Sequence, residues 1–276
     1  MDVSDAPLVD VPLVETQQAF DAVAKTYHRS NVDNAILAGM RERLRQTVRR
    51  YVRAGSDLLD LGCGPGTDTE YFAANTYCTT AIDWSPAMVA EARQRLAAAG
   101  LQALVDVRHL GIDDVHRLAP KTFDAVCSDL GPLNCVANLE QAAGRIADRI
   151  RPGGFLIASV IGRLCPWEIA LYASRGDWRR LRVRFARARV PVPLEGRTVW
   201  VRYYAPRAFE RPFRAAGLRP VERRALGVFL PPPYLNAFAA RHPTLIHRLE
   251  RMEDAMARWP IVRSCGDHFL IVMQKN

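Results

Sequence analysis

The chain has 276 residues, of which 49% are apolar and 24% charged, a composition that excludes a disordered polypeptide. The formal net charge of +9 comes almost entirely from arginine, since lysine occurs only at Lys25, Lys121 and Lys275. A basic balance is compatible with three anionic partners: nucleic acid, anionic lipid or a phosphorylated substrate.

The six cysteines are scattered, and no two of them form a CxxC pair. The spacing therefore excludes a common zinc motif or a disulfide framework and predicts reduced thiols, no bound metal and a cytoplasmic location. The N-terminal segment lacks the basic start and apolar core of a signal peptide. The longest apolar run, residues 155–162, falls well short of the ~18 residues that a membrane-spanning helix needs.

The first fifth of the chain predicts a loose leader followed by helix. Residues 1–15 contain two prolines and form the leader. Over residues 16–53, apolar side chains recur at steps of three and four, which predicts helix. We expect residues 1–53 to form an N-terminal helical cap.

Strand and helix alternate between residues 54 and 162. Ser85 and Pro86 provide a helix start, and Gly100 provides a stop. Alternation of this kind predicts an α/β fold with a doubly wound, Rossmann-like, mostly parallel sheet. The predicted strands are 57–61, 78–83, 103–109, 123–128 and 155–160, and the predicted helices are 67–75, 85–100 and 138–150.

The alternation weakens after residue 162. We expect residues 163–276 to provide a helical lid or insertion together with the final strands of the core sheet. The predicted elements are helices at 166–189 and 206–217, extended segments at 197–204, 219–229 and 267–273, and one or two helices at 234–257.

The segment Asp60–Thr67 (DLGCGPGT) lies between a predicted strand and a predicted helix, where doubly wound sheets bind nucleotides. Its three glycines, spaced GxGxG, permit positive φ and let a ligand approach the backbone. A dinucleotide fingerprint has glycine or alanine at the position of Thr67. Asp60 can face an ammonium group, and Asp83, which ends the next strand, can accept both hydroxyls of a ribose.

With these residues, the chain resembles the class I S-adenosylmethionine-dependent methyltransferases of the small-molecule, UbiE-like type. The segment FDAVAKTY at residues 20–27 resembles the FDxxAxxY element of that family, and Phe123-Asp124 and the RPGG of residues 151–154 match two further landmarks. The resemblance covers residues ~16–160 and implies a seven-stranded sheet. It also implies that residues 54–162 are the cofactor-binding core.

The resemblance implies S-adenosylmethionine as the cofactor. In the family, the glycine segment wraps the methionine part and the acid at Asp83 holds the ribose. An acid that contacts adenine is replaced here by Gly111, which leaves the backbone of Ile112 or the side chain of Asp113 for that contact. The implied cofactor-binding residues are Tyr27, Asp60, Gly62, Cys63, Gly64, Gly66, Asp83, Trp84, Met88, Ile112, Asp113, Ser128 and Asp129.

Methyl transfer from a sulfonium is an in-line displacement, so the protein mainly supplies alignment and a dry pocket. A general base is needed only for a weakly acidic hydroxyl or a protonated amine. The segment Ser128–Cys135 corresponds to the active-site loop of the family and lacks the N/D-P-P-Y/F motif of amine methylation. The candidate catalytic residues are Asn134, Tyr203 and His268, and the candidates for an acceptor pocket are Trp167, Glu168, Tyr172, Trp200, Tyr203, Tyr204, Phe229 and Tyr234.

Residues 175–189 contain seven arginines, and a solvated basic helix of a lid is favoured over contact with an anionic substrate, a membrane or RNA. We expect methylation of oxygen, nitrogen or carbon on a small, partly apolar molecule. Nucleic acid is disfavoured as a partner, membrane contact is at most peripheral, and a homodimer is left open. The alternatives are an RNA or protein methyltransferase, a non-catalytic cofactor-binding protein and, disfavoured by Thr67, a nucleotide-binding oxidoreductase.

Overall fold

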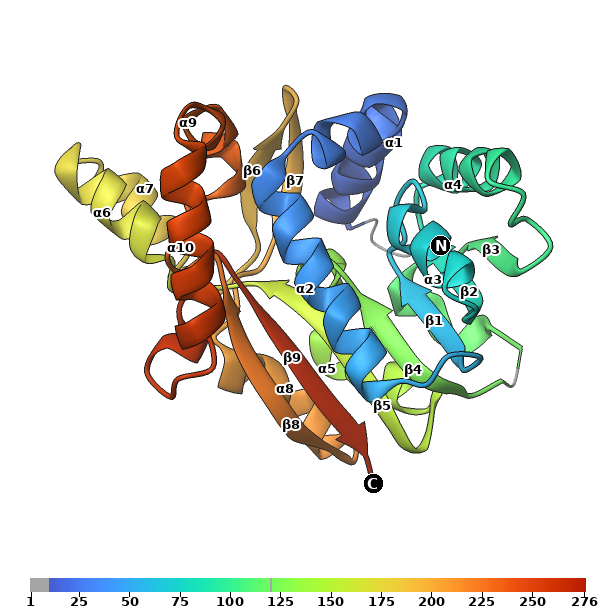
Figure 1. Ribbon diagram of the computed structural model, residues 1–276. Helices are drawn as coiled ribbons and strands as arrows, with labels where there is room; N and C mark the ends of the chain where they lie inside the picture. The colour runs from blue at the N-terminus through green and yellow to red at the C-terminus, as the bar shows by residue number, and fades with distance from the viewer. Residues whose placement is uncertain (1–9, 120) are drawn as a thin grey trace, which may run out of the picture.

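The computed structural model describes residues 10–119 and 121–276 (Figure 1). A seven-stranded sheet with the order β3-β2-β1-β4-β5-β9-β8 lies at its centre. Strand β9 runs antiparallel to both of its neighbours, and the other neighbouring strands are parallel, which confirms the predicted fold class. The strands are β1 (Asp57–Leu61), β2 (Cys78–Asp83), β3 (Val105–His109), β4 (Phe123–Ser128), β5 (Ile150–Ile161), β8 (Leu218–Leu226) and β9 (His268–Lys275).

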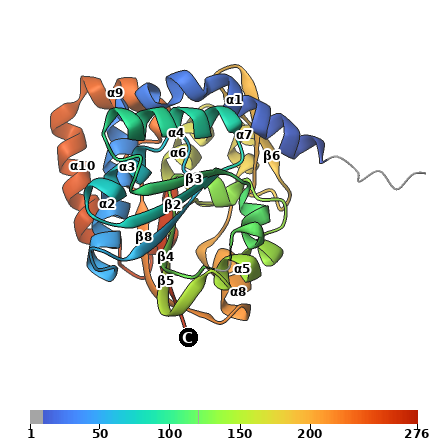
Figure 2. The ribbon, with the colours of Figure 1, turned by 90° about the vertical axis from the view of Figure 1, so that its right-hand side faces the viewer.

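Helices cover both faces of this sheet (Figures 1 and 2). One face is covered by α2 (Ala35–Tyr51), α3 (Thr67–Ala74), α4 (Pro86–Ala98), α9 (Asn236–Arg241) and α10 (Pro243–Met256). The other face is covered by the 3-10 helix η1 (Ile112–Arg117), α5 (Leu139–Ala147) and α8 (Pro206–Ala215). The chain is therefore a three-layer α/β structure.

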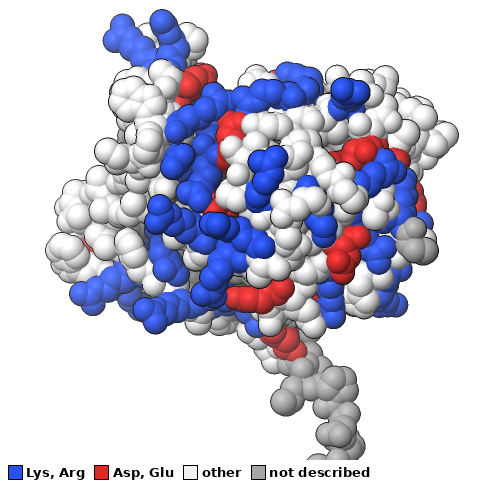
Figure 3. Space-filling view, turned by 90° about the horizontal axis from the view of Figure 1, so that it is seen from below, with Lys and Arg blue, Asp and Glu red and all other residues white. Residues whose placement is uncertain are grey.

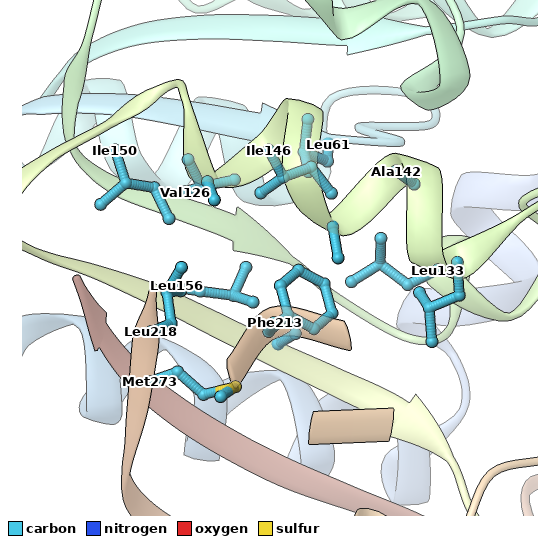
Figure 4. Packing of buried hydrophobic residues seen from close by; sticks show 14 of the residues in the cluster. Leu61, Val126, Leu133, Ala142, Ile146, Ile150, Leu156, Phe213, Leu218 and Met273 are labelled. Carbon is cyan, nitrogen blue, oxygen red and sulfur yellow. The ribbon is translucent and has the colours of Figure 1, made fainter. Parts of the chain in front are cut away.

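Alternate residues of the strands serve the two cores, because successive side chains of a strand point to opposite faces. In β1, Leu58 packs in the core beneath α2, whereas Leu59 and Leu61 pack in the core beneath α5 and α8. Figure 4 shows this second core, where Phe213 of α8 lies between side chains of the sheet and of α5. Burial on both faces explains why the central strands β1 and β5 are mostly apolar, whereas the edge strand β3 keeps exposed polar side chains.

Two helices precede the sheet, α1 (Val11–Val32) and α2. The side chain of Asn34 accepts hydrogen bonds from two backbone N–H groups of the first turn of α2, so the single helical stretch predicted for residues 16–53 is interrupted here. The prediction of a loose leader over residues 1–15 is wrong from Val11 onward, and residues 1–9 lie outside the described part of the chain.

The predicted helix at 166–189 is wrong. The chain forms two short helices, α6 (Pro166–Ser174) and α7 (Trp178–Val183), and between them Gly176 adopts a φ of 65°. A two-stranded ribbon of β6 (Val190–Leu194) and β7 (Arg197–Val201) follows and packs against α1. The sequence predicts only β7 as extended. The two prolines of β6 disfavour a strand, because proline cannot donate a backbone hydrogen bond to a sheet. The division of the chain at residues 53 and 162 stays a prediction.

Arg184 belongs to the arginine-rich segment and yet is buried. Its guanidinium pairs with Glu168 of α6 (Nε–Oε2 2.6 Å) and with Asp267, and it donates to the carbonyl of Gly162 (2.8 Å). Although burial raises the pKa of Asp267, Arg184 holds it well below its ordinary value. The segment is therefore tied to the end of the sheet and is not a wholly solvated helix. Within residues 10–119 and 121–276, no helix is long and apolar enough to span a membrane.

Glu253 of α10 is fully buried, and its carboxylate accepts hydrogen bonds from the backbone N–H groups of Gly227 (2.7 Å), Val228 (3.1 Å) and Phe229 (2.9 Å). Glu253→Ala would leave these donors unpaired, so we expect the free energy of unfolding to fall by about 3 kcal/mol. Urea denaturation followed by circular dichroism measures this change. Glu250→Ala, on the same helix but partly exposed, should cost less than about 1 kcal/mol, and equal losses would contradict the assignment.

Candidate functional site

A cavity of about 260 Å³ lies at the carboxyl ends of β1, β2 and β4. Figure 1 shows α1 and the β6–β7 ribbon above this edge of the sheet, where doubly wound sheets bind their ligands. The structure brings eleven of the thirteen predicted cofactor residues to its walls: Tyr27, Asp60, Gly62, Cys63, Gly64, Asp83, Trp84, Met88, Ile112, Asp113 and Asp129.

The glycine segment forms one wall, and Gly62, Gly64 and Gly66 all have positive φ (69°, 53° and 78°), which a side chain would strain. A Cβ on Gly62 would lie 2.4 Å from Pro132, and a Cβ on Gly66 would lie 3.0 Å from Ala92, whereas a Cβ on Gly64 would meet nothing within 4 Å. Gly62 and Gly66 are therefore required by close packing. Gly64 leaves its backbone open to a ligand.

Asp83 ends β2 and faces the glycine segment. Its Oδ2 accepts a hydrogen bond from the N–H of Gly64 (2.9 Å), and its Oδ1 accepts one from the N–H of Ser85 (2.9 Å). Burial raises the pKa of Asp83 to about 6, against the effect of these two bonds. One carboxylate thus holds the loop in place and keeps further lone pairs for a ligand.

Asp60 lies in β1 and is only 3% exposed. It accepts a hydrogen bond from the hydroxyl of Thr69 (2.6 Å), and burial raises its pKa to about 7. Among the described residues, no cation forms an ion pair with Asp60. A buried carboxylate without a cation is costly, so a positively charged ligand would complete this site.

Carboxylates dominate the charge of the cavity. Among the described lining residues, Arg41 of α2 is the one basic side chain. Its Nη1 lies 3.6 Å from Oδ2 of Asp68. The basic side chains gather instead on outer surfaces, as Figure 3 shows for the face opposite α1 and the ribbon. The cavity therefore favours a cationic ligand and disfavours a pyrophosphate. The lining acids are Asp60, Asp68, Asp83, Asp113 and Asp129.

Three polar residues outside the predicted set also line the cavity: Arg41, Thr67 and Asp68. Arg41 is one of five arginines in α2, and no spacing distinguishes it from the other four. Thr67 and Asp68 begin α3 directly after the glycine segment, so their position at a free helix N-terminus was the signal that identifies them.

The part of the cavity beneath the ribbon is aliphatic. Side chains of β7 alternate, so that Val199 and Val201 are buried toward the cavity while Thr198 is exposed. None of the residues predicted for an acceptor pocket is among the described lining residues. Phe20 of α1, an aromatic residue outside that prediction, does line the cavity. The other apolar lining residues here are Leu130, Cys135, Ile161, Val192, Pro193 and Leu194.

Asn134, a candidate catalytic residue, does not line the cavity in the described structure. Its amide donates to the carbonyls of Ile161 (3.1 Å) and Arg202 (2.7 Å), and its oxygen accepts from the N–H of Ile161 (2.9 Å). These bonds join the end of β5 to the segment after β7. Two of the predicted cofactor residues do not line the cavity. Gly66 packs against Ala92, and the hydroxyl of Ser128 donates to the carbonyl of Leu61 in β1 (3.1 Å).

Tyr203 and His268, the other catalytic candidates, lie in the buried cluster around Arg184. The Nδ1 of His268 is 2.8 Å from a carboxylate oxygen of Asp267, and the guanidinium of Arg184 lies 4.9 Å from the centre of the Tyr203 ring. These contacts support a structural role. Across residues 10–119 and 121–276, no group of three or more His, Cys, Asp or Glu side chains is arranged to hold a metal ion. The absence of a metal stays a prediction.

Comparison with known proteins agrees with this geometry. Residues 58–154 match the family described as "Methyltransferase domain". A ubiquinone biosynthesis O-methyltransferase of Xylella fastidiosa is 31% identical over 162 residues, which are 52% of this chain and 64% of that relative, so the match spans less than two thirds of the relative's length.

Two solved structures share the fold. The CcbJ methyltransferase of Streptomyces caelestis has a TM-score of 0.62 at 16% identity, covering 95% of this chain and 98% of its own. The 1,6-didemethyltoxoflavin-N1-methyltransferase of Burkholderia thailandensis, solved with 1,6-didemethyltoxoflavin and S-adenosylhomocysteine, has a TM-score of 0.58 at 17% identity, covering 99% and 93%. The chain therefore shares the fold of these two methyltransferases. Residues 58–154 are in addition similar to the methyltransferase domain family.

The buried carboxylate of Asp60 makes stability depend on pH. Its pKa of about 7 in the folded protein exceeds its ordinary value of 3.8, so the folded state binds this proton more tightly than the unfolded state does. The resulting stabilisation is fully present below pH 3.8 and is lost as the pH rises through about 7. We expect unliganded Asp60→Asn to lack this loss, so that the stabilities of variant and parent, measured by urea unfolding, diverge between pH ~4 and ~7. A difference that stays constant with pH would contradict the assignment.

Proposed function

We propose that this chain binds S-adenosylmethionine in the cavity and transfers its methyl group to a small, partly apolar molecule. The observation that carries the proposal is a set of buried or half-buried carboxylates around an open glycine loop, with one arginine beside them. These carboxylates belong to Asp60, Asp68, Asp83 and Asp113. S-adenosylmethionine contains a sulfonium and an ammonium cation, which these carboxylates complement. A dinucleotide would bring a pyrophosphate to carboxylates of like charge.

Each part of the cofactor has a set of residues that would hold it. The ribose would meet Asp83, and the methionine backbone would follow the open backbone at Gly64. The adenine would lie near Met88 and Ile112, with the carboxylate of Asp113 available to its amino group. When bound, the cofactor supplies a methyl group that is already activated by the sulfonium.

The carboxylate of the cofactor would lie beside Arg41. The first turn of α3 begins at Thr67 and presents free backbone N–H groups, which favour an anion. Thr67 is held from the other side by His28 (Nδ1–Oγ1 3.0 Å), and Tyr27 lines the same region. This arrangement supports the predicted role of Tyr27 near the carboxylate and adds Arg41 to it.

The chain's own contribution to the reaction is alignment and exclusion of water. The aliphatic ribbon covers the acceptor side of the cavity, and the acidic side holds the cofactor. A small-molecule acceptor is supported by the cavity's modest volume of about 260 Å³ and by the name of the Xylella relative. The acidic walls give no support to a nucleic-acid acceptor, whose backbone requires cations. A cytoplasmic location remains our prediction, and a homodimer is left open.

Asp83→Ala should weaken binding of S-adenosylmethionine, because it removes charge-assisted hydrogen bonds to the ribose. A loss of about 1.5–3 kcal/mol corresponds to a Kd about 10–100-fold higher. Isothermal titration measures the Kd of the parent protein and of Asp83→Ala. The control is Asp106→Ala, which changes an exposed aspartate on β3 and should keep the parent's affinity. Unchanged affinity in Asp83→Ala would refute the ribose assignment. Tighter binding of NAD than of S-adenosylmethionine by the parent would refute the proposed function.

Arg41→Gln should raise the Kd for S-adenosylmethionine about tenfold, because it removes the cation beside the cofactor's carboxylate. The same variant should bind decarboxylated S-adenosylmethionine as well as the parent does. Arg49→Gln, an exposed position on the same helix, is the control and should change neither titration. Equal loss of both ligands in Arg41→Gln would show that Arg41 supports the fold of the site and does not contact the carboxylate.

A further inference from the structure

The loop after β4 contains a buried carboxylate oxygen, Oδ2 of Asp129, that accepts no hydrogen bond from the described residues. Asp129 uses Oδ1 to accept hydrogen bonds from the N–H of Leu130 (3.0 Å) and the hydroxyl of Ser159 (2.5 Å). Its Oδ2 is buried and has no hydrogen-bond partner in the part of the chain that the structure describes. Buried polar atoms are normally paired, so a donor from a bound molecule would complete this oxygen.

Asp129 is held in place by its surroundings. Leu130 adopts a φ of 57°, a left-handed conformation that is strained for a residue other than glycine, and Gly131 follows with a φ of 96°. Ser159, which is fully buried in β5, fixes the carboxylate from the neighbouring strand. Strain of this kind is concentrated at functional sites, and here it positions one carboxylate at the wall of the cavity.

The position of Asp129 is at the boundary between the two parts of the cavity. Because Asp60 pairs with Cys127 in the register of β1 and β4, Asp129 follows β4 next to the glycine segment. On its other side, the chain continues through Leu130 into the aliphatic part beneath the ribbon. Asp129 is thus the acid that adjoins both the proposed cofactor and the space for the acceptor.

The aliphatic part places a strong restriction on the acceptor. Among the described residues beneath the ribbon, only apolar side chains line the wall, so a charged acceptor would lose its hydration without compensation. The thiol of Cys135 also lines this part, but burial raises its pKa to about 12, so it stays protonated. Asp129 is left as the group that can accept a proton there.

Building on the proposed function, we propose that the acceptor is an uncharged, apolar molecule with a hydroxyl group and that Asp129 binds this hydroxyl through Oδ2. The acceptor oxygen forms a bond to the methyl carbon while the bond from that carbon to sulfur breaks and its electron pair stays on sulfur. The hydroxyl proton passes to Oδ2 of Asp129 and from there to solvent. The products are a methyl ether and S-adenosylhomocysteine.

Three naphthalenes of equal shape test the class of acceptor: 2-naphthol, 2-naphthylamine and 2-naphthoate. Each is titrated into the complex of the protein with S-adenosylhomocysteine. We expect 2-naphthol to bind at least about tenfold more tightly than the anionic 2-naphthoate, which Asp129 repels, and more tightly than 2-naphthylamine. In Asp129→Asn, the preference over 2-naphthoate should shrink by about threefold but should not vanish, because the repelling charge is gone while the loss of hydration beneath the ribbon remains.

The same experiment separates this inference from the proposed function. The inference assigns Asp129 to the acceptor in place of the cofactor role that the sequence analysis predicts for it. Asp129→Asn should therefore keep the parent's affinity for S-adenosylmethionine within about threefold and should lower formation of 2-methoxynaphthalene about 100-fold or more. Asp114→Asn, an exposed acid on η1, is the control and should match the parent. If Asp129→Asn loses cofactor affinity, Asp129 serves the cofactor and the inference fails while the proposed function stands. Failure of the parent to bind S-adenosylmethionine defeats the proposed function itself.

The remaining outcomes are equally decisive. Preferred binding of 2-naphthylamine points to an amine acceptor and overturns the inference. Failure of the parent protein to bind any of the three compounds also overturns it. So does binding of 2-naphthol by the parent protein without formation of 2-methoxynaphthalene. A second pair of variants tests the ribbon: Val192→Arg, which points into the cavity, should favour 2-naphthoate over 2-naphthol. Thr198→Arg, on the outward face of β7, should not. The same preference in both variants would contradict the ribbon as the acceptor wall.

Discussion

The hydrogen bond from the N–H of Gly64 to the carboxylate of Asp83, 2.9 Å long, joins the tips of two neighbouring strands. The parallel register of β1 and β2 brings these groups together, since Leu61 pairs with Ile82 directly before them. The glycine loop can remain open only because this bond holds it from one side and close packing holds it from below. The buried acid on β2 is thus a structural clamp, and we propose that it also binds the ligand.

The cavity separates two physical tasks. Its acidic side would attract and orient the cationic cofactor that we propose, a role for fixed charge at low dielectric. Its aliphatic side excludes water and selects by shape and polarity. The ribbon that forms the aliphatic wall follows the arginine-rich segment, and that segment is tied to the end of the sheet by the buried pair of Arg184 and Asp267. Distant parts of the chain therefore meet above one edge of the sheet.

The sheet and most residues on the acidic side of the cavity could be predicted from the sequence, because both depend on local signals. Continuous apolar segments mark buried strands, and the glycines with Asp83 mark a ligand edge. The ribbon could not be predicted, since the prolines of β6 oppose strand formation and only packing on α1 explains it. The positions of Tyr203 and His268 away from the cavity could not be predicted for a similar reason. Both lie in the cluster around Arg184, and no local sequence pattern shows that this arginine is buried.

A crystal structure of this protein with S-adenosylhomocysteine is the most direct test that the acidic side of the cavity is the cofactor site. The ribose hydroxyls should lie within hydrogen-bond distance of Asp83, with the sulfur facing the aliphatic space beneath the ribbon. A ligand bound elsewhere, or a glycine loop that must leave Asp83 to admit it, would contradict the carboxylate-lined cavity as the basis of function.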